Sequence, residues 1–166
     1  MYKKIVVPLD GSKLAECILP YVEGLAKGCG TEEVILVSVT ERIVGRTRAP
    51  EIREKGYSLS SDVWPPEGEV SMYMGKKTSQ AYRYLHKIAK GLEGKGVKVQ
   101  TQVLYGKPAE KIASFAEEIG ADLIALASHG RSGPSRWAYG SVAEKVFRAG
   151  CVAILMVRAP GCIVGF

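Results

Sequence analysis

Hydrophobic positions in this chain follow two patterns, short apolar runs and longer stripes with helical spacing. The short runs predict buried strands at 4–9, 34–39, 97–105, 121–127 and 151–157. Between them, apolar residues recur at three- and four-residue intervals and predict helices at 12–27, 76–93, 108–119 and 141–148. Pro20 lies inside the first stripe and predicts a kink there. Along 97–105 apolar and polar residues alternate, which predicts a strand with one more exposed face, at a sheet edge.

The alternation of strands and helices predicts the fold class. Parallel strands joined by right-handed helical crossovers form a sheet that helices cover on both faces. We therefore expect an α/β protein with a doubly wound, five-stranded parallel sheet, Rossmann-like, in a single domain over residues 1–166. Such sheets bind ligands beyond the carboxyl ends of their strands. Asp10, Val39 and the loop after Ala127 all fall at that edge, although Asp10 in Asp-Gly-Ser also suits a turn or helix cap.

Residues 40–75 form an irregular excursion between the second strand and the second helix. The segment is rich in Gly, Pro and charged residues and has few apolar anchors. Connections of this length in a compact domain are usually functional, mobile or partly structured. We expect it either to pass over the ligand-binding edge or towards another subunit, or to be a partly disordered loop.

Composition and charge narrow the class of protein. The net charge of +6 comes from scattered Lys and Arg, with no basic run interleaved with aromatic residues, so we expect no nucleic-acid partner. The four cysteines show no spacing suited to zinc and are expected to be reduced thiols. The amino terminus has too short an apolar core for a signal peptide, and no run is long enough to span a bilayer. We expect a cytoplasmic protein with no membrane partner.

The stretch from Leu126 to Val146 carries the candidate chemistry. A buried apolar run ends at Ala127, a loop rich in Gly, Ser, His and Arg follows, and a helix begins at Gly140-Ser141. A helix start presents unpaired N–H groups and a positive dipole end, which suit an anion. Glycine lets the backbone approach a ligand closely. The stretch predicts a phosphate cradle for a nucleotide; the alternative is an ordinary strand-to-helix connection whose glycines serve only the turn.

Several segments together resemble the universal stress protein family over almost the whole chain. They are the start at 6–12, Gly106 to Ile112, Ala121 to Ile124, Ser128 to Gly133 and Gly140 to Val146. The nucleotide-binding branch of that family carries Gly, two residues, Gly, nine residues, then Gly with Ser or Thr. Here Gly130, nine intervening residues and Gly140-Ser141 match, while Ala127 replaces the first glycine.

The resemblance implies an ATP site, with Mg²⁺ as the accompanying ion, in a regulatory protein of the stress response. It places Asp10 at the adenosine and Val39 at the adenine, and it assigns the phosphates to the backbone of Gly130, Gly140, Ser141 and Val142. Ala127, Ser128 and His129 complete the candidate binding residues. The resemblance also implies a homodimer paired through the last strand, Val152 to Val157, although the apolar tail could instead fold back on its own sheet.

Catalysis and other nucleotide folds have weaker support in the sequence. No Walker-type Gly-Lys-Ser/Thr and no Gly-x-Gly-x-x-Gly after the first strand is present. Ser128 and His129 are adjacent, but neighbours in a loop need not face each other, and we expect His129 to order the loop. Positioning of phosphates alone would permit slow ATP hydrolysis, not efficient turnover. The alternative function is a nucleotide-free dimeric interaction protein of the same fold.

Overall fold

The computed structural model describes residues 1–40, 58–59, 76–129 and 140–158 of the chain. Its strands are β1 (Lys4–Pro8), β2 (Glu33–Thr40), β3 (Ser58–Leu59), β4 (Val99–Tyr105), β5 (Leu123–Ala127) and β6 (Ala153–Val157). Its helices are the 3₁₀ helix η1 (Ala15–Ile18) and α1 (Leu19–Gly28), α3 (Lys76–Glu93), α4 (Pro108–Glu118) and α5 (Ser141–Ala149). No described helix is long and apolar enough to cross a membrane.

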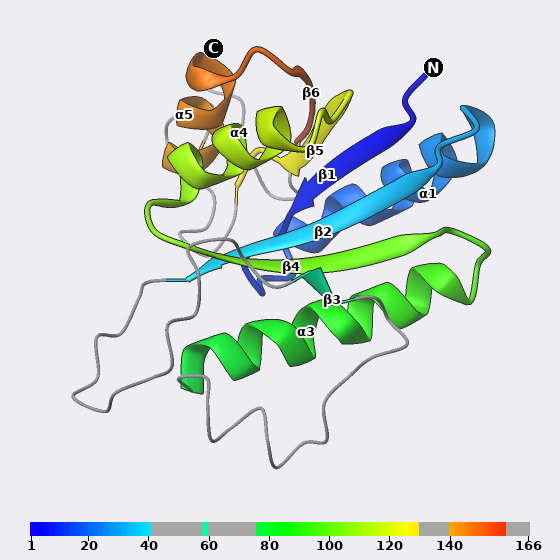
Figure 1. The fold of residues 1–166 in the computed structure, drawn as a ribbon, viewed down its shortest axis with the longest axis horizontal. Coiled ribbons are helices and arrows are strands. Elements are labelled where there is room, and N and C mark those ends of the chain that lie inside the picture. The colour runs from blue at the N-terminus through cyan, green and yellow to red at the C-terminus, as the bar shows by residue number, and fades with distance from the viewer. Residues whose placement is uncertain (41–57, 60–75, 130–139, 159–166) are drawn as a thin grey trace.

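The sheet confirms the predicted doubly wound α/β class. Its strand order is β3-β4-β2-β1-β5-β6, and every pairing except β3 with β4 is parallel. Helices α4 and α5 cover one face, while η1, α1 and α3 cover the other (Figure 1). The five predicted strands form the parallel part, and β3 adds a two-residue antiparallel strand from within the 40–75 excursion. The rest of that excursion, the loop 130–139 and the tail 159–166 lie outside the described residues.

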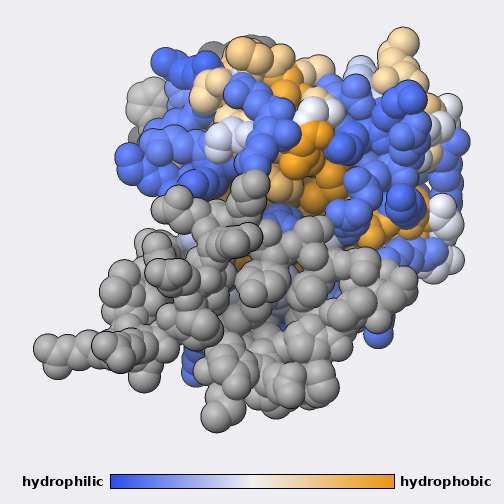
Figure 2. Space-filling model, viewed as in Figure 1, coloured by the Kyte–Doolittle hydropathy of each residue, from blue (hydrophilic) through white to orange (hydrophobic). Residues whose placement is uncertain are grey.

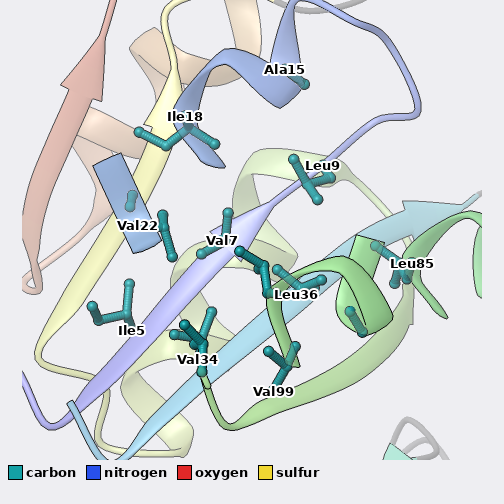
Figure 3. Close-up of a cluster of buried hydrophobic side chains, with 14 of the residues drawn as sticks. Ile5, Val7, Leu9, Ala15, Ile18, Val22, Val34, Leu36, Leu85 and Val99 are labelled. Carbon is teal, nitrogen blue, oxygen red and sulfur yellow. The ribbon is translucent and has the colours of Figure 1, made fainter. Parts of the chain in front are cut away.

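Strands of a doubly covered sheet carry apolar residues on both sides, and β1 shows this most clearly. Ile5, Val6 and Val7 are fully buried, with Val6 facing the α4/α5 layer and its two neighbours facing the α1/α3 layer. Figure 3 shows Ile18 and Val22 from the helical layer close to Val7 and Ile5. Each layer of helices thus packs on its own side of the same strand.

Pro20 does not kink a continuous helix, as the sequence predicted, but lies near the start of one. The segment divides into η1 and α1, and Pro20 occupies the first turn of α1. In that turn the missing proline N–H has no helical acceptor to lose, so the residue is tolerated without a break in the hydrogen-bond ladder.

The prediction that 97–105 lies at a sheet edge holds for the parallel part of the sheet, where β4 is the last strand, but the expected exposure of its polar face is wrong. Strand β4 pairs with β2 over seven residues and with β3 at Thr101 and Gln102. Those two polar residues are only 7% and 3% exposed. Gln102 lies on the α4 side of the strand with Leu104, while Thr101 lies on the α3 side with Val103, so the polar positions do not mark an open face.

The central strands should set the stability of the fold. Leu36 on β2 is fully buried in the cluster shared by β1, β4 and α3. Leu36→Ala should lower the free energy of unfolding by about 2–5 kcal/mol, because it removes buried methyl groups and leaves a cavity. Chemical denaturation measures this, with Lys13→Ala, an exposed change expected to cost within about 0.5 kcal/mol, as the control. A loss for Leu36→Ala no larger than that of the control would contradict this placement of the core.

Candidate functional site

A cavity of about 350 Å³ opens at the carboxyl edge of the sheet. Its volume lies in the range of small-molecule sites. The ends of β1, β2 and β5 form its floor, and the first turns of α4 and α5 form its sides. The candidate residues that line it are Asp10, Val39, Ala127, Ser128, His129, Gly140, Ser141 and Val142. The structure therefore brings together every candidate residue except Gly130, which lies outside the described residues.

Asp10 occupies the end of β1 and serves a turn as well as the cavity. Its Oδ1 accepts the backbone N–H of Ser12 at 2.9 Å, and the Ser12 hydroxyl in turn accepts the N–H of Ala15 at 3.1 Å. This is the Asx-type turn that Asp-Gly-Ser predicts. Gly11 has a φ of 87°, which an L side chain rarely adopts, so glycine is required at this bend. The turn holds the Asp10 carboxylate at the cavity wall.

The base of the cavity is apolar. Val37 and Val39 from β2 lie opposite Pro108 and Ile112 from the first turns of α4. Sequence reasoning missed the two α4 residues, yet the signal was present: Gly106-Lys107-Pro108 directly follows a strand, so it also falls at the carboxyl edge. An apolar slot between a strand end and a helix suits a flat, largely apolar group.

The polar side of the cavity depends on Ser128. Its backbone N–H donates to the carbonyl of Val157 at 2.7 Å, and its carbonyl accepts the N–H of Gly140 at 2.7 Å. Gly140 is the N-cap of α5, with no side chain capping the helix. Ser128 therefore fixes the start of α5 against the ends of β5 and β6. The Gly140 N–H is already used by Ser128, so it is not available to phosphate as the resemblance implied. Among the described residues of α5, the N–H groups without an acceptor in the helix are those of Ser141 to Ala143.

Ser128 and His129 do face each other, although their adjacency did not require it. The Ser128 Oγ and the His129 Nδ1 are 3.0 Å apart, and the two residues are 2% and 3% exposed. A buried, mutually hydrogen-bonded pair at the bend is well suited to ordering the loop. This side-chain contact holds the same bend that the Ser128 backbone joins to the start of α5.

Ala127 adopts ordinary strand geometry. It pairs with Val157 in the β5–β6 ladder, and no described residue other than glycine has a positive φ. The replacement of the first motif glycine therefore stores no backbone strain at this position. Its methyl group lines the cavity, so any effect of the replacement on a ligand is one of space alone.

Metal-binding side chains are not clustered in the described part of the chain. Within those ranges no group of three or more His, Cys, Asp or Glu could hold a metal ion.

The fold and the cavity define a class: doubly wound α/β proteins with a cavity at the carboxyl edge of the sheet, where such folds bind their ligands. The family model described as the universal stress protein family matches residues 1–158. The chain belongs to the universal stress protein family.

Individual relatives agree with this assignment. The chain is 34% identical over 159 residues to universal stress protein MJ0577 of Methanocaldococcus jannaschii, a match that covers 95% of this chain and 96% of that protein. The solved structure of MJ0577 superposes with a TM-score of 0.73 at 32% identity, covering 97% and 99% of the two chains. A universal stress protein in complex with cAMP superposes with a TM-score of 0.63 at 18% identity, covering 95% and 98%.

The contact between Gly140 and Ser128 gives a test of the site's construction. A Cβ on Gly140 would lie 3.0 Å from the Ser128 carbonyl oxygen and 3.5 Å from the His129 Cα. Since the φ of Gly140 is −68°, alanine would be strained by this contact and not by its backbone angles. Gly140→Ala should cost about 1–3 kcal/mol of folding free energy.

Gly24→Ala is the matched control for that measurement. Gly24 lies inside α1 with no atom within 4 Å of an added Cβ. Alanine there should stabilise the protein by about 0.5–1 kcal/mol because glycine is a poor helix former. Denaturant titration measures the free energy of unfolding of both variants. If Gly140→Ala raised it, as Gly24→Ala should, α5 would not start against Ser128.

Proposed function

We propose that this protein is a regulatory module that binds an adenine nucleotide, ATP with Mg²⁺, in the cavity at the carboxyl edge. The observation that carries the proposal is the convergence of three separate strand ends and the start of α5 on one cavity of about 350 Å³. The cavity combines an apolar slot with a polar end, which matches a molecule with a flat base at one end and phosphates at the other.

The roles of the lining residues follow from their placement. Val37, Val39 and Ile112 offer the apolar surface for the adenine. The Asp10 carboxylate, held at the end of β1, is placed to accept hydrogen bonds from ribose hydroxyls. One solved protein of this fold is described as a complex with cAMP, so the architecture accommodates an adenine nucleotide in that relative.

The phosphates are assigned to the first turn of α5. Ser141 and Val142 present backbone N–H groups beside the Ser141 hydroxyl, and the helix dipole adds a partial positive charge. Gly140 contributes space, because its Cβ would occupy the narrow gap beside Ser128 and His129. Nothing in the described site pairs an exposed nucleophile with a base, so the proposed role is binding rather than rapid turnover.

Calorimetric titration with Mg-ATP tests the proposal. The wild-type protein should bind, and Gly140→Asp should weaken binding by at least about tenfold, or 1.4 kcal/mol, since a carboxylate at the cradle repels phosphate. Gly24→Asp places the same charge on the exposed surface of α1 and should leave the affinity unchanged. Ala127→Gly should bind as tightly as the wild type or more tightly, because it only adds room. An absence of binding by the wild-type protein would favour the nucleotide-free interaction protein instead.

We also propose that two copies associate through β6. This strand forms one edge of the sheet, and its sequence, Ala-Ile-Leu-Met-Val, is entirely apolar although no residue in it is fully buried. An uncovered apolar edge strand is a template for pairing with another strand. A second β6 would cover it by antiparallel pairing.

Light scattering coupled to size exclusion tests the association. The wild-type protein should have a mass near twice 17.9 kDa. Ala153→Lys puts a charge on the exposed start of β6 and should shift the protein to the monomer, as lysine does at natural edge strands. Tyr21→Lys, on the exposed surface of α1, is the control and should remain dimeric. A monomeric wild type at working concentration would refute the pairing.

A further inference from the structure

The outer face of α3 carries a line of cations that the nucleotide site does not use. Lys76, Gln80, Arg83, Lys87 and Lys90 follow one another at intervals of three or four residues and are all exposed. This spacing places side chains on one face of a helix. We call the cations Lys76, Arg83, Lys87 and Lys90 the α3 stripe. At 1.5 Å per residue the stripe is about 21 Å long.

The α3 stripe contains no ion pair among the described residues. Several exposed cations elsewhere do pair with carboxylates, as Lys3 does with Glu32 at 2.9 Å and Lys13 with Glu16 at 2.7 Å. Just beyond α3, Lys95 pairs with Glu23 at 2.6 Å. Within the described ranges, none of the four stripe residues forms an ion pair with a carboxylate.

This arrangement costs stability in the isolated protein. Arg83 and Lys87 lie four residues apart, Lys87 and Lys90 three, and like charges at these spacings on a helix repel one another. Lys76 also lies in a first turn that contains no acidic residue, where a cation opposes the helix dipole. A helix face that lines up four exposed cations, none of them ion-paired among the described residues, is complementary to a polyanion.

The chemistry of the stripe favours phosphates over a protein or lipid partner. Protein interfaces depend on buried aromatic or aliphatic anchors. The apolar side chains of α3 are committed to the core: Tyr82, Leu85, Ala89 and Leu92 are buried, and Ala81, Tyr84 and Ile88 are half-buried and pack against the same cluster. Membrane-surface helices likewise insert an apolar face, which α3 has committed to the core. What remains outside is charge, with Gln80 as a further hydrogen-bonding group.

We propose that the α3 stripe binds the phosphate backbone of a nucleic-acid duplex without reading its sequence. A stripe of about 21 Å spans roughly six base pairs at 3.4 Å each, enough for four phosphate contacts. Because its inner face is packed on β2 and β4, α3 lies along the backbone and does not enter a groove. The proposal departs from the expectation of no nucleic-acid partner, which rested on the absence of a continuous basic run; the helix assembles the cations from separated positions.

Fluorescence anisotropy with a labelled duplex of mixed sequence, about 20 base pairs long, tests the proposal over roughly 50–200 mM NaCl. The full-length protein should bind, and log K should fall against log [NaCl] with a slope of about −3.6, or −0.9 for each of four phosphate contacts. Arg83→Gln with Lys87→Gln should reduce the slope to about −1.8, since two contacts are lost. Two duplexes of unrelated sequence should bind alike.

Lys3→Gln with Lys13→Gln is the matched control, because it removes two exposed cations outside α3 and lowers the net charge equally. It should leave the slope unchanged. If the slope fell equally in both double variants, the attraction would be to net charge alone and the proposal would be overturned. An absence of duplex binding at the lowest salt would also overturn it. Stripe-dependent binding to phosphatidylserine vesicles without duplex binding would overturn it in favour of a membrane surface. Gly140→Asp should bind duplex like the wild type; its failure to do so would place the contact at the cavity.

Discussion

The parallel register of β1 with β2 and β5 is the constraint on which the rest of the structure depends. Pro8 lies beside Val37, and the Leu9 N–H donates to the Val37 carbonyl at 2.7 Å, so β1 ends beside the last part of β2, which runs on to Thr40. Strand β5 pairs with β1 on the other side. A parallel arrangement puts three carboxyl ends, and the connections that leave them, at one edge. A shift of one residue would turn every side chain of a strand to the opposite layer, so the two apolar layers fix the register.

That register is transmitted to the start of α5 through the backbone of one residue. The Ser128 N–H donates to the Val157 carbonyl, and the Ser128 carbonyl accepts the Gly140 N–H, both at 2.7 Å. The position of the first turn of α5 therefore follows from the β5–β6 pairing and not from the course of the loop 130–139. Because the side chain of Ser128 bonds to His129 as well, the bend between strand and helix is held from two directions. Preorganised N–H groups of this kind bind an anion without an entropic cost of ordering.

The parallel strands and the start of α5 can be predicted from the sequence, because the patterns that indicate them are local. Continuous apolar runs identified the parallel strands, and Gly140-Ser141 after a buried strand located the start of a helix. The predictions for Pro20 and for the polar face of β4 are wrong for a common reason. A proline or an alternating pattern describes one segment, whereas the outcome depended on where η1 ended and on which elements covered β4. Pro108 and Ile112 were missed because their place at the cavity comes from the crossover of α4, a long-range feature.

Figure 2 shows hydrophilic residues over most of the coloured part of the face seen there, with a strip of apolar residues between them. The distribution of charge has a consistent physical logic. At the amino ends of the strands, the Asp122 carboxylate accepts the N–H groups of Lys3 and Lys4 at 2.9 and 2.8 Å, so polar groups there are used internally. On α1, hydrogen bonds from Lys27 and then Lys95 lower the pKa of Glu23 below its ordinary value, so these charges also neutralise one another.

The carboxyl edge and the outer face of α3 are the contrasting surfaces. The first presents helix N–H groups without a capping side chain, and the second presents cations without carboxylates among the described residues. A positive potential at a surface raises the local concentration of negatively charged ligands, which is the physical basis of both proposals. The two surfaces differ in shape, one a cavity and the other a convex line. The first can enclose a single small anion, whereas the second can only lie along an extended one.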